Sequence, residues 1–456
     1  MHRLGLSVIA VVACCIAIDA GAQAEERRVT NAEEFSAALE AAGEGDDIVL
    51  APGSYAGELM RDNLHKVTIS SADPANPGVI EGGSYGLHLT DPTEVTLANL
   101  VFQGQAENGI NIDDAGSYET PARDIRLINI TVKDIGEGGN HDAIKMAGVD
   151  GFLIDGARIE NWGDDGSAID FVGCRNGLVQ NSLLTHSALK VGGSGIRPKG
   201  GSKNIVIRAN RVELPVATGR AIQAGGSTDA EFFRFAEGDK GYEADDITIE
   251  GNVVVGGGAA FSWVNIDGGI VHHNLVQGPA PWVLRILNEN EASAIVVTKN
   301  GAFADNEVAF ETGGAFNRPV NVGDGTEPET FTFARNRWIN LADPTPDGSR
   351  PELPATESDG VYGEALANAP DRVQVWNFPW GTWLVNATAT ESRVEVTDAA
   401  GLKRVAAGDG ARFDPLTERP LEGAWSGEDL ASATVTLPAM SQAILINPEA
   451  CAGCLE

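Results

Sequence analysis

Four segments of the chain align without a gap: DAIKMAG at residues 142–148, SAIDFVG at 167–173, SGIRPKG at 194–200 and RAIQAGG at 220–226. Their isoleucines stand at positions 144, 169, 196 and 222, so successive copies are 25, 27 and 26 residues apart. A period of this length, with short apolar strands and no long helix, is typical of a solenoid in which each repeat forms one coil. The segments therefore predict an all-β fold, a right-handed parallel β-helix.

Asparagine recurs along the same part of the chain. The asparagines at 181, 210, 252, 274, 306 and 336 are 22 to 42 residues apart, and each ends a short apolar strand. An asparagine at one turn of each coil can satisfy backbone groups with its side-chain amide. We therefore expect these asparagines to stack from coil to coil.

A helix is expected to cap the first coil. The segment TNAEEFSAALEAAG begins with a capping box formed by Thr30 and Glu33. Phe35 and Leu39 then share one helical face with Ala38 and Ala42. A solenoid end without a cap exposes strand edges and core, so a helix is expected here.

The N-terminus reads MHRLGLSVIAVVACCIAIDAGAQA, with a basic start, an apolar stretch and a small-x-small sequence at 22–24. This pattern predicts that residues 1–24 are a signal peptide and that the protein is secreted or periplasmic. An alternative is a lipoprotein signal with Cys14 as the lipidated residue. No later segment is long and apolar enough to span a membrane.

The coils are expected to fill residues 25–342. Residues 343–370 are rich in proline and polar residues and predict a linker, and residues 371–456 predict a small antiparallel β module. Its tryptophans, Trp376, Trp380 and Trp383, are interpreted as core, with stacking on sugar rings as the alternative. Cys451 and Cys454 form a C-x-x-C that predicts a local disulfide in an exported protein, and Cys174 stands alone.

The chain has 456 residues and a formal net charge of −33. Its overall field will not attract nucleic acid, and we expect a soluble monomer. An acidic polymer is repelled as well, unless a local cationic patch or a bound metal reverses the sign. Such a patch is present: residues 134–170 carry a net charge of −7, whereas residues 190–220 carry a net charge of +6.

The alignment places charged residues on one face. If the aligned isoleucines point inward, the residues that follow them point outward. Neighbouring strands are about 4.8 Å apart, so aligned positions stack into rows. The first outward row is Lys145, Asp170, Arg197 and Gln223, and the second is Ala147, Val172, Lys199 and Gly225. One interpretation of these rows is a surface ladder of ion pairs, which contributes little to stability.

The other interpretation is β-elimination from a uronate. The C5 proton of a uronate is removed only after its carboxylate is neutralised, by calcium held on carboxylates or by an arginine. Lys199 is the predicted base, because nearby cations lower the pKa of a lysine. The predicted calcium ligands are Asp142, Asp164, Asp165 and Asp170. Arg197 and Arg220 are candidates for neutralising the carboxylate, and Lys145 and Gln223 for binding the substrate.

The helix-capped start, the asparagine-marked coils and the acidic and basic segments resemble the β-helix polysaccharide lyases, of the pectate lyase type, over residues 28–340. HDAIK, DDGSAID and GIRPKGG are similar to the family-nine lyases. That likeness implies Asp142, Asp164 and Asp165 as calcium ligands and Lys199 as base, although Asp170 falls two residues late. The family-six lyases pair a lysine base with an arginine about one coil later, which implies Lys199 and Arg220. Gly192 and Ser194 stand where that family has calcium-binding glutamates.

Three further residues are candidates. His186 and Tyr242 are candidates for the acid that protonates the leaving oxygen, or for the base if Lys199 is not. Arg234 lies in an insertion that breaks the coil rhythm, and it is a candidate for binding a substrate carboxylate.

The sequence thus predicts an exported lyase that cleaves an acidic, uronate-containing polysaccharide with Ca²⁺ or arginine assistance. The alternatives are a β-helix glycoside hydrolase acting through Asp164, Asp165 or Asp170, a C5-epimerase, and a non-catalytic glycan-binding surface protein.

Overall fold

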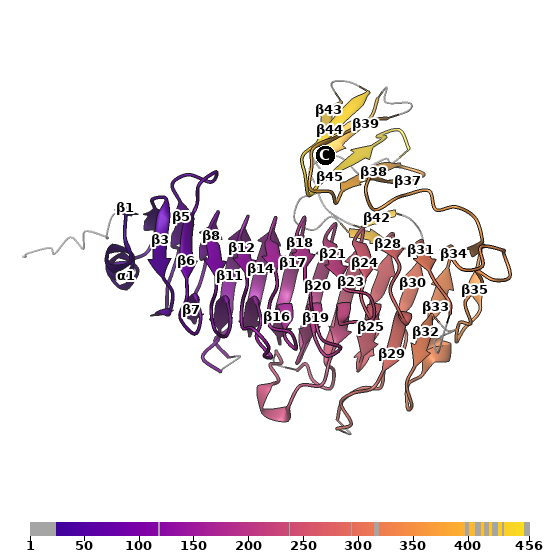
Figure 1. Cartoon of the computed structure of the whole chain (residues 1–456), viewed down its shortest axis with the longest axis horizontal. Coiled ribbons are helices and arrows are strands. Elements are labelled where there is room, and N and C mark those ends of the chain that lie inside the picture. Colours follow the sequence, from indigo (N-terminus) through magenta and orange to yellow (C-terminus); the bar gives the residue numbers. More distant parts are fainter. Residues whose placement is uncertain are drawn as a thin grey trace, which may run out of the picture.

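The computed structural model describes residues 24–116, 119–236, 238–292, 294–313, 319–396, 401–405, 412–414, 419–421, 427–430 and 433–450. Three long parallel sheets run side by side along the molecule, and successive coils stack along its length (Figure 1). The fold is a parallel β-helix, as the repeats predicted. Residues 1–23 of the predicted signal peptide, which include Cys14, lie outside the described residues, as do Cys451 and Cys454.

Each sheet takes one strand from nearly every coil. The 10-stranded sheet consists, in spatial order, of β32 (Val320–Val322), β29 (Trp282–Leu287), β25 (Ala259–Val264), β22 (Arg220–Gly225), β19 (Ser194–Lys199), β16 (Ser167–Val172), β13 (Ile144–Ala147), β10 (Ile110–Asp113), β7 (Leu87–Thr90) and β4 (Leu59–Asp62).

The 14-stranded sheet consists of β1 (Glu26–Val29), β2 (Asp47–Leu50), β5 (Thr68–Ser71), β8 (Thr96–Ala98), β11 (Ala122–Ile128), β14 (Val149–Asp155), β17 (Arg175–Gln180), β20 (Ser202–Arg208), β23 (Ala244–Glu250), β27 (Ile270–His272), β30 (Ala302–Ala304), β33 (Thr332–Ala334) and β35 (Glu357–Ser358), with β26 (Ile266–Asp267) paired to β23.

The 12-stranded sheet consists of β3 (Gly53–Ala56), β6 (Gly78–Glu81), β9 (Val101–Gln103), β12 (Thr131–Lys133), β15 (Arg158–Glu160), β18 (Leu183–Thr185), β21 (Arg211–Leu214), β24 (Val253–Gly256), β28 (Leu275–Gln277), β31 (Glu307–Phe310), β34 (Arg337–Asn340) and β36 (Val361–Tyr362). Strands β35 and β36 lie within residues 343–370, so the segment predicted as a linker also carries the last two strands of the β-helix.

Helix α1 (Ala32–Ala41) caps the first coil, as predicted, and buries Phe35, Ala38 and Leu39. The capping box is one residue later than predicted. Asn31 is the N-cap and accepts from the backbone N of Glu34, whose carboxylate accepts from Thr30 N at 2.8 Å. Asn31 takes this role because its extended backbone directs its amide oxygen at the first turn of the helix.

A ladder of asparagines runs through the second half of the β-helix. The backbone N and the side-chain amide of Asn210 both donate to Oδ1 of Asn252, at 3.0 and 3.1 Å, and the same pattern continues through Asn274 and Asn306 to Asn336. The predicted stack is therefore confirmed from 210 to 336. Asn181 is not part of it: its backbone has a positive φ of 53°, and the buried N–H of Ser182 takes its place below Asn210.

The C-terminal residues form an antiparallel module. Its five-stranded sheet consists of β37 (Gln374–Phe378), β38 (Gly381–Asn386), β45 (Ser441–Ile446), β40 (Lys403–Val405) and β43 (Gly427–Asp429). Two further pairs are β39 (Ser392–Glu395) with β44 (Thr434–Leu437) and β41 (Arg412–Asp414) with β42 (Arg419–Leu421).

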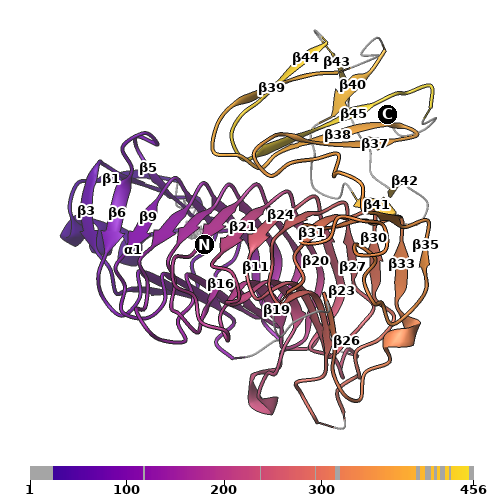
Figure 2. The ribbon, with the colours of Figure 1, turned by 45° about the vertical axis from the view of Figure 1, so that its right-hand side comes forward.

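Figure 2 shows this module lying over one side of the coils. Trp376, Trp380 and Trp383 are buried and belong to one apolar cluster with Ala209, Val253 and Leu275 of the β-helix. The tryptophans are therefore core residues, as interpreted from the sequence. No helix among the described residues is long and apolar enough to cross a membrane.

Candidate active site

The register of the 10-stranded sheet reproduces the predicted rows as far as Arg197 and Lys199. Ile144, Ile169, Ile196 and Ile222 are paired from strand to strand and fully buried. Lys145 pairs with Asp170, and Asp170 pairs with Arg197. Because the isoleucines fill the interior, these charged neighbours lie on the outer face of the sheet.

Asp170 lies at the centre of this row, and three cations meet at its carboxylate. Lys145 Nζ donates to Oδ2 at 3.0 Å, Arg197 Nε donates to Oδ1 at 3.1 Å, and Lys199 Nζ lies 3.5 Å from Oδ1. The side chains of Lys145, Arg197 and Lys199 are 37%, 16% and 17% exposed, whereas that of Asp170 is 0% exposed. A ligand approaching the face therefore meets cations, and the carboxylate lies beneath them.

These contacts fix the ionisation of the buried groups. Burial alone disfavours the charged form of Asp170, but Arg197, Lys145 and Lys199 outweigh it and hold the pKa of this carboxyl well below its ordinary value. Burial also opposes the charge on Lys145, yet Asp170 and Asp142 raise the pKa of Lys145. Asp142 shows the opposite shift: burial and the nearby Asp170 charge raise its pKa.

Lys199 is held less tightly than the other two cations. Among the described residues its Nζ makes this one ion pair, at 3.5 Å, and no hydrogen bond. Burial lowers the pKa of Lys199, Arg197 and Lys145 lower it further, and Asp170 acts in the opposite direction. A Cβ added at Gly226 would lie 3.2 Å from both Cβ and Cδ of Lys199, so this glycine is what lets the lysine stem lie against the turn. These features suit a lysine that gains and loses a proton.

Arg220 lies on the outer face, although it stands two residues before Ile222, where strict alternation gives the inward direction. Ala221 and Ile222 are consecutive and both buried, so the alternation shifts by one residue at this point. Arg220 binds the carboxylate of Glu289 at 2.7 and 3.2 Å and donates to Gln223 Oε1 at 2.5 Å. Gln223 is itself 1% exposed and donates to Gly225 O, so it orients Arg220 within the face.

Glu289 was not found from the sequence. It follows β29 and lies 69 residues from Arg220, so no coil spacing connects the two positions. The only signal for it is that its segment interrupts the regular repeat.

The four predicted calcium ligands do not come together as a ligand set. Asp142 accepts from Ser167 N at 2.8 Å and from Lys145 Nζ at 2.9 Å. Asp165 pairs with Lys190 at 3.1 Å, and Asp164 lies 3.8 Å from the same lysine. Within the described part of the chain no three His, Cys, Asp or Glu side chains are placed to hold a metal ion. Asp142, Asp164 and Asp165 are thus paired with lysines in this structure, and their role as calcium ligands stays a prediction.

The two proposed proton donors have other contacts. His186 follows β18; its Nε2 lies 2.7 Å from Trp162 O, and its Nδ1 accepts from Ala188 N at 3.0 Å. Burial lowers the pKa of His186, so the ring is neutral and holds a turn. The ring of Tyr242 packs edge-on against Phe235 and lies 5.7 Å from Lys203 Nζ, over the 14-stranded sheet. A catalytic role for either residue stays a prediction.

Arg234 is anchored to the coils. Its Nε lies 3.3 Å from the carboxylate of Asp114, which is fully buried, and its backbone N donates to Gly200 O at 2.9 Å. The insertion that carries Arg234, with the 3-10 helix η1 (Ala230–Phe232), is thereby fastened beside the turn that follows Lys199. The predicted role of Arg234 in binding a substrate carboxylate stays untested; in this structure its guanidinium contacts the carboxylate of Asp114 and the backbone carbonyls of Glu231 and Phe233.

Glu243 ties the insertions to the face. Its carboxylate is fully buried and accepts from Gly200 N at 2.9 Å, from Thr228 N and Oγ1 at 2.7 Å each, and from Asn290 Nδ2 at 2.8 Å. The residue after Lys199, the first insertion and the segment after β29 therefore share one acceptor. Sequence reasoning missed this residue, since it stands between two motifs and has no counterpart in the other coils.

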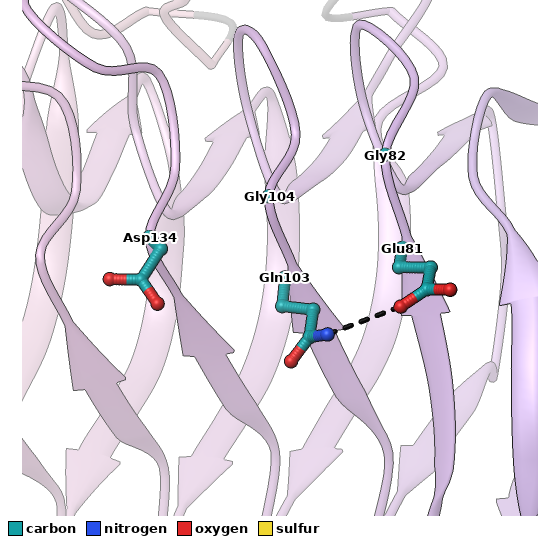
Figure 3. Close-up of a pocket in the computed structure, with 5 residues that line it drawn as sticks. All are labelled: Glu81, Gly82, Gln103, Gly104 and Asp134. Carbon is teal, nitrogen blue, oxygen red and sulfur yellow. Dashed lines mark hydrogen bonds between the residues drawn. The ribbon is translucent and has the colours of Figure 1, made fainter.

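A separate hollow of about 450 Å³ lies on the turns that follow β6, β9 and β12 of the 12-stranded sheet. Figure 3 shows Glu81, Gln103 and Asp134 projecting there from three adjacent coils, with Gln103 donating to Glu81 at 3.2 Å. Its charged groups are carboxylates, so it does not suit an acidic ligand.

No protein-family model matches the sequence, and no curated protein matches it. Among solved structures, a GH136 lacto-N-biosidase from Eubacterium ramulus has a TM-score of 0.50 at 10% identity, covering 74% of this chain and 68% of that one. The A-module of an Azotobacter vinelandii mannuronan C-5 epimerase has a TM-score of 0.46 at 14% identity, covering 72% of this chain and 94% of that one. An alginate lyase from Paenibacillus sp. str. FPU-7 has a TM-score of 0.37 at 14% identity, covering 74% of this chain and 95% of that one.

At these identities the similarity concerns the fold alone. The chain is a parallel β-helix protein, and its distinguishing feature is a face on which partly exposed cations cover a buried carboxylate.

Proposed function

We propose that this protein is a polysaccharide lyase that cleaves a uronate-containing glycan by β-elimination. The observation that carries the proposal is the layering at Asp170. The three cations that surround it are partly exposed, and the carboxylate itself is not. A face built in this way attracts a negatively charged sugar within a protein whose overall charge of −33 would otherwise repel one.

The residues divide the reaction between them. Arg197 and Lys145 bind the uronate carboxylate and so acidify the proton at C5. Lys199, in its neutral form, takes that proton. The electron pair left at C5 forms a C4–C5 double bond as the C4–O bond breaks, and the leaving oxygen takes a proton from solvent. Arg220 lies one strand further along and stabilises the charge that develops on the leaving oxygen.

Calcium has no step in this proposal. The carboxylate oxygens of Asp142 and Asp170 contact the cations Lys145, Arg197 and Lys199. The carboxylates of Asp164 and Asp165 lie near the ammonium of Lys190. Arginine and lysine therefore neutralise the uronate carboxylate, which is the second of the two routes expected from the sequence.

A hydrolase is the second candidate, and one observation favours it. Asp142 and Asp170 both contact Lys145 Nζ, and their pKa values are shifted in opposite directions, as in a pair of catalytic acid and nucleophile. Their side chains are 3% and 0% exposed, however, so a sugar reaches the cations before either carboxylate. A C5-epimerase shares the proton abstraction with the lyase and differs only in returning the proton to the sugar.

The deciding experiment incubates the purified protein with pectate, alginate, hyaluronan, chondroitin and glucuronan. A lyase produces an unsaturated uronide that absorbs in the ultraviolet, and Lys199→Ala serves as the matched control. New reducing ends without absorbance would establish a hydrolase. Inversion at C5 without cleavage would establish an epimerase, and binding without turnover a glycan-binding protein.

The sequence of residues 1–24 further supports export, which places the protein where such polymers occur.

A further inference from the structure

A second cationic group lies on the same face, three strands beyond Arg197. In β29, Leu284 and Ile286 are buried, whereas Trp282 and Arg285 lie on the outer side and are partly exposed. Arg285 occupies the same row as Gln223 and Ser262, to which it is connected by the strand register. The face of the β-helix therefore continues past the Asp170 cluster with a planar cation stacked on an indole.

The guanidinium of Arg285 is held in place without a charged partner. It lies 4.5 Å from the centre of the Trp282 ring, and its Nε donates to Asn321 Oδ1 at 3.2 Å. Among the described residues it forms no ion pair. Burial and the neighbouring Arg220 together lower the pKa of Arg285 to about 10, although Glu289 acts in the opposite direction. A bound carboxylate would supply the missing partner, and a stacked arginine is preorganised to bind one with two hydrogen bonds.

Cations outnumber carboxylates around Arg285, as they do around Asp170. Arg220 and Arg285 lie near one carboxylate, that of Glu289. Around Asp170, the side chains of Lys145, Arg197 and Lys199 lie near two carboxylates, those of Asp170 and Asp142.

The spacing of the two clusters determines how long a ligand must be to contact both of them. From β19 to β29 there are three strand steps, which correspond to about 14 Å at the usual strand separation. A single sugar does not bridge this distance, whereas an oligosaccharide that runs across the strands does. Both of its ends would then carry a carboxylate.

We propose that Arg285 and Trp282, with Arg220 and Glu289, form a second carboxylate subsite, so that the ligand is an oligosaccharide with uronates repeated along its length. This inference rests on the proposed function, since the same face binds the sugar that reacts. It narrows the ligand to a polyuronide and excludes a glycan with one isolated uronate.

The test measures binding by the full-length Lys199→Ala variant, which does not consume its ligand. The probes are homopolymeric galacturonate and mannuronate oligosaccharides, from disaccharide to octasaccharide, together with the same oligosaccharides after carboxyl reduction. Affinity should rise with length until the chain reaches both clusters. The added substitution Arg285→Gln should remove that rise and weaken binding of the long oligosaccharides about tenfold, leaving the short ones unchanged.

Arg337→Gln is the matched control, because Arg337 pairs with Glu364 on the 12-stranded sheet. Equal affinity of the Arg285→Gln and parent proteins for the long oligosaccharides would overturn the subsite. The outcomes separate the two proposals. If wild-type protein releases no unsaturated product but the length dependence still requires Arg285, the subsite stands and the lyase reaction fails. If unsaturated product forms but Arg285 has no effect on the length dependence of binding, the lyase reaction stands and the subsite fails.

Discussion

The ammonium of Lys199 lies 3.5 Å from Oδ1 of Asp170, farther than Arg197 Nε or Lys145 Nζ lie from the same carboxylate. Of the three cations, Lys199 therefore makes the weakest contact with the buried carboxylate, so loss of its charge destabilises Asp170 least. In the proposed reaction this looser contact distinguishes the group that exchanges a proton from the groups that only carry charge.

Replacing Lys199 with alanine should reduce turnover to background and leave the fold intact, because a side chain on the outer face contributes little to the core. Replacing it with arginine should also abolish turnover, since a guanidinium does not release its proton near neutral pH. Ultraviolet absorbance measures the product, and a thermal melt shows that both variants are folded. A Lys199→Ala protein that keeps most of its activity would remove Lys199 from the mechanism.

The pH dependence follows from the neighbours of Lys199. Activity requires the neutral amine, so it should rise with pH and level off above the pKa of Lys199. Lys145 lowers that pKa. The substitution Lys145→Gln should therefore raise it and move the rising limb of the profile to higher pH. The measurement is kcat/KM against pH for both proteins. An unchanged profile, or a shift to lower pH, would show that another group titrates.

Asp170 should be critical for stability. Replacing it with asparagine leaves three neighbouring cations without their shared carboxylate, and breaking a buried pair of this kind costs about 3–5 kcal/mol. The comparable change Asp165→Asn affects an exposed ion pair and should cost less than about 1 kcal/mol. Denaturant unfolding of the two variants and the parent measures the difference. Equal unfolding midpoints for all three would contradict the central position assigned to Asp170.

The same carboxylate predicts how the protein responds to acid. The folded pKa of Asp170 is lowered, so its stabilisation is complete above its unfolded pKa, about 3.9, and is lost as the pH falls below that value. Wild type should lose stability below about pH 4 more steeply than Asp170→Asn does.

Removal of divalent metal should leave turnover largely unchanged, because the aspartates expected to bind calcium are paired with lysines and an arginine. The measurement compares initial rates with a chelator, with added Ca²⁺ and with neither. Complete loss in chelator, restored by Ca²⁺, would show that the pairings at Asp142 and Asp165 open to admit an ion.

Glu243 should act as a positioning residue for Lys199. A glutamine there keeps one acceptor oxygen for the four donors that now reach the carboxylate, so the turn at Gly200 loses its anchor. Glu243→Gln should lower kcat about tenfold with little change in KM, since a misplaced base slows chemistry more than binding. Glu364→Gln, on an exposed glutamate, is the control. An unchanged kcat with reduced stability would assign Glu243 a structural role only.

The fold was predictable because the four repeat segments between residues 142 and 226 align without a gap. Four isoleucines at one coil spacing define the inward direction, and the positions of Lys145, Asp170, Arg197 and Lys199 follow from it by alternation. The asparagine ladder was predictable for the same reason, except at Asn181, where a left-handed turn moves the amide out of the stack.

Other parts of the site depend on contacts that alternation does not describe. Strict alternation gives the wrong direction for Arg220, because Ala221 and Ile222 are consecutive and both buried. Glu289 and Glu243 lie in irregular segments, and their partners are 69 and 43 residues away. The aspartates predicted as calcium ligands were chosen as carboxylates and from the resemblance to the lyases, and neither ground carries information on the lysines that reach them.

The stacking of the coils also fixes the distances between side chains on the outer face. Each coil contributes one strand, so the separation of the Asp170 cluster from Arg285 is fixed by how many coils lie between them. Duplication or loss of the coil that contains β25 would move Arg285 by one strand width and leave the isoleucine register and the asparagine ladder in phase. Chain-length preference in such a protein changes in whole steps, through gain or loss of a repeat, while the reacting cluster stays as it is.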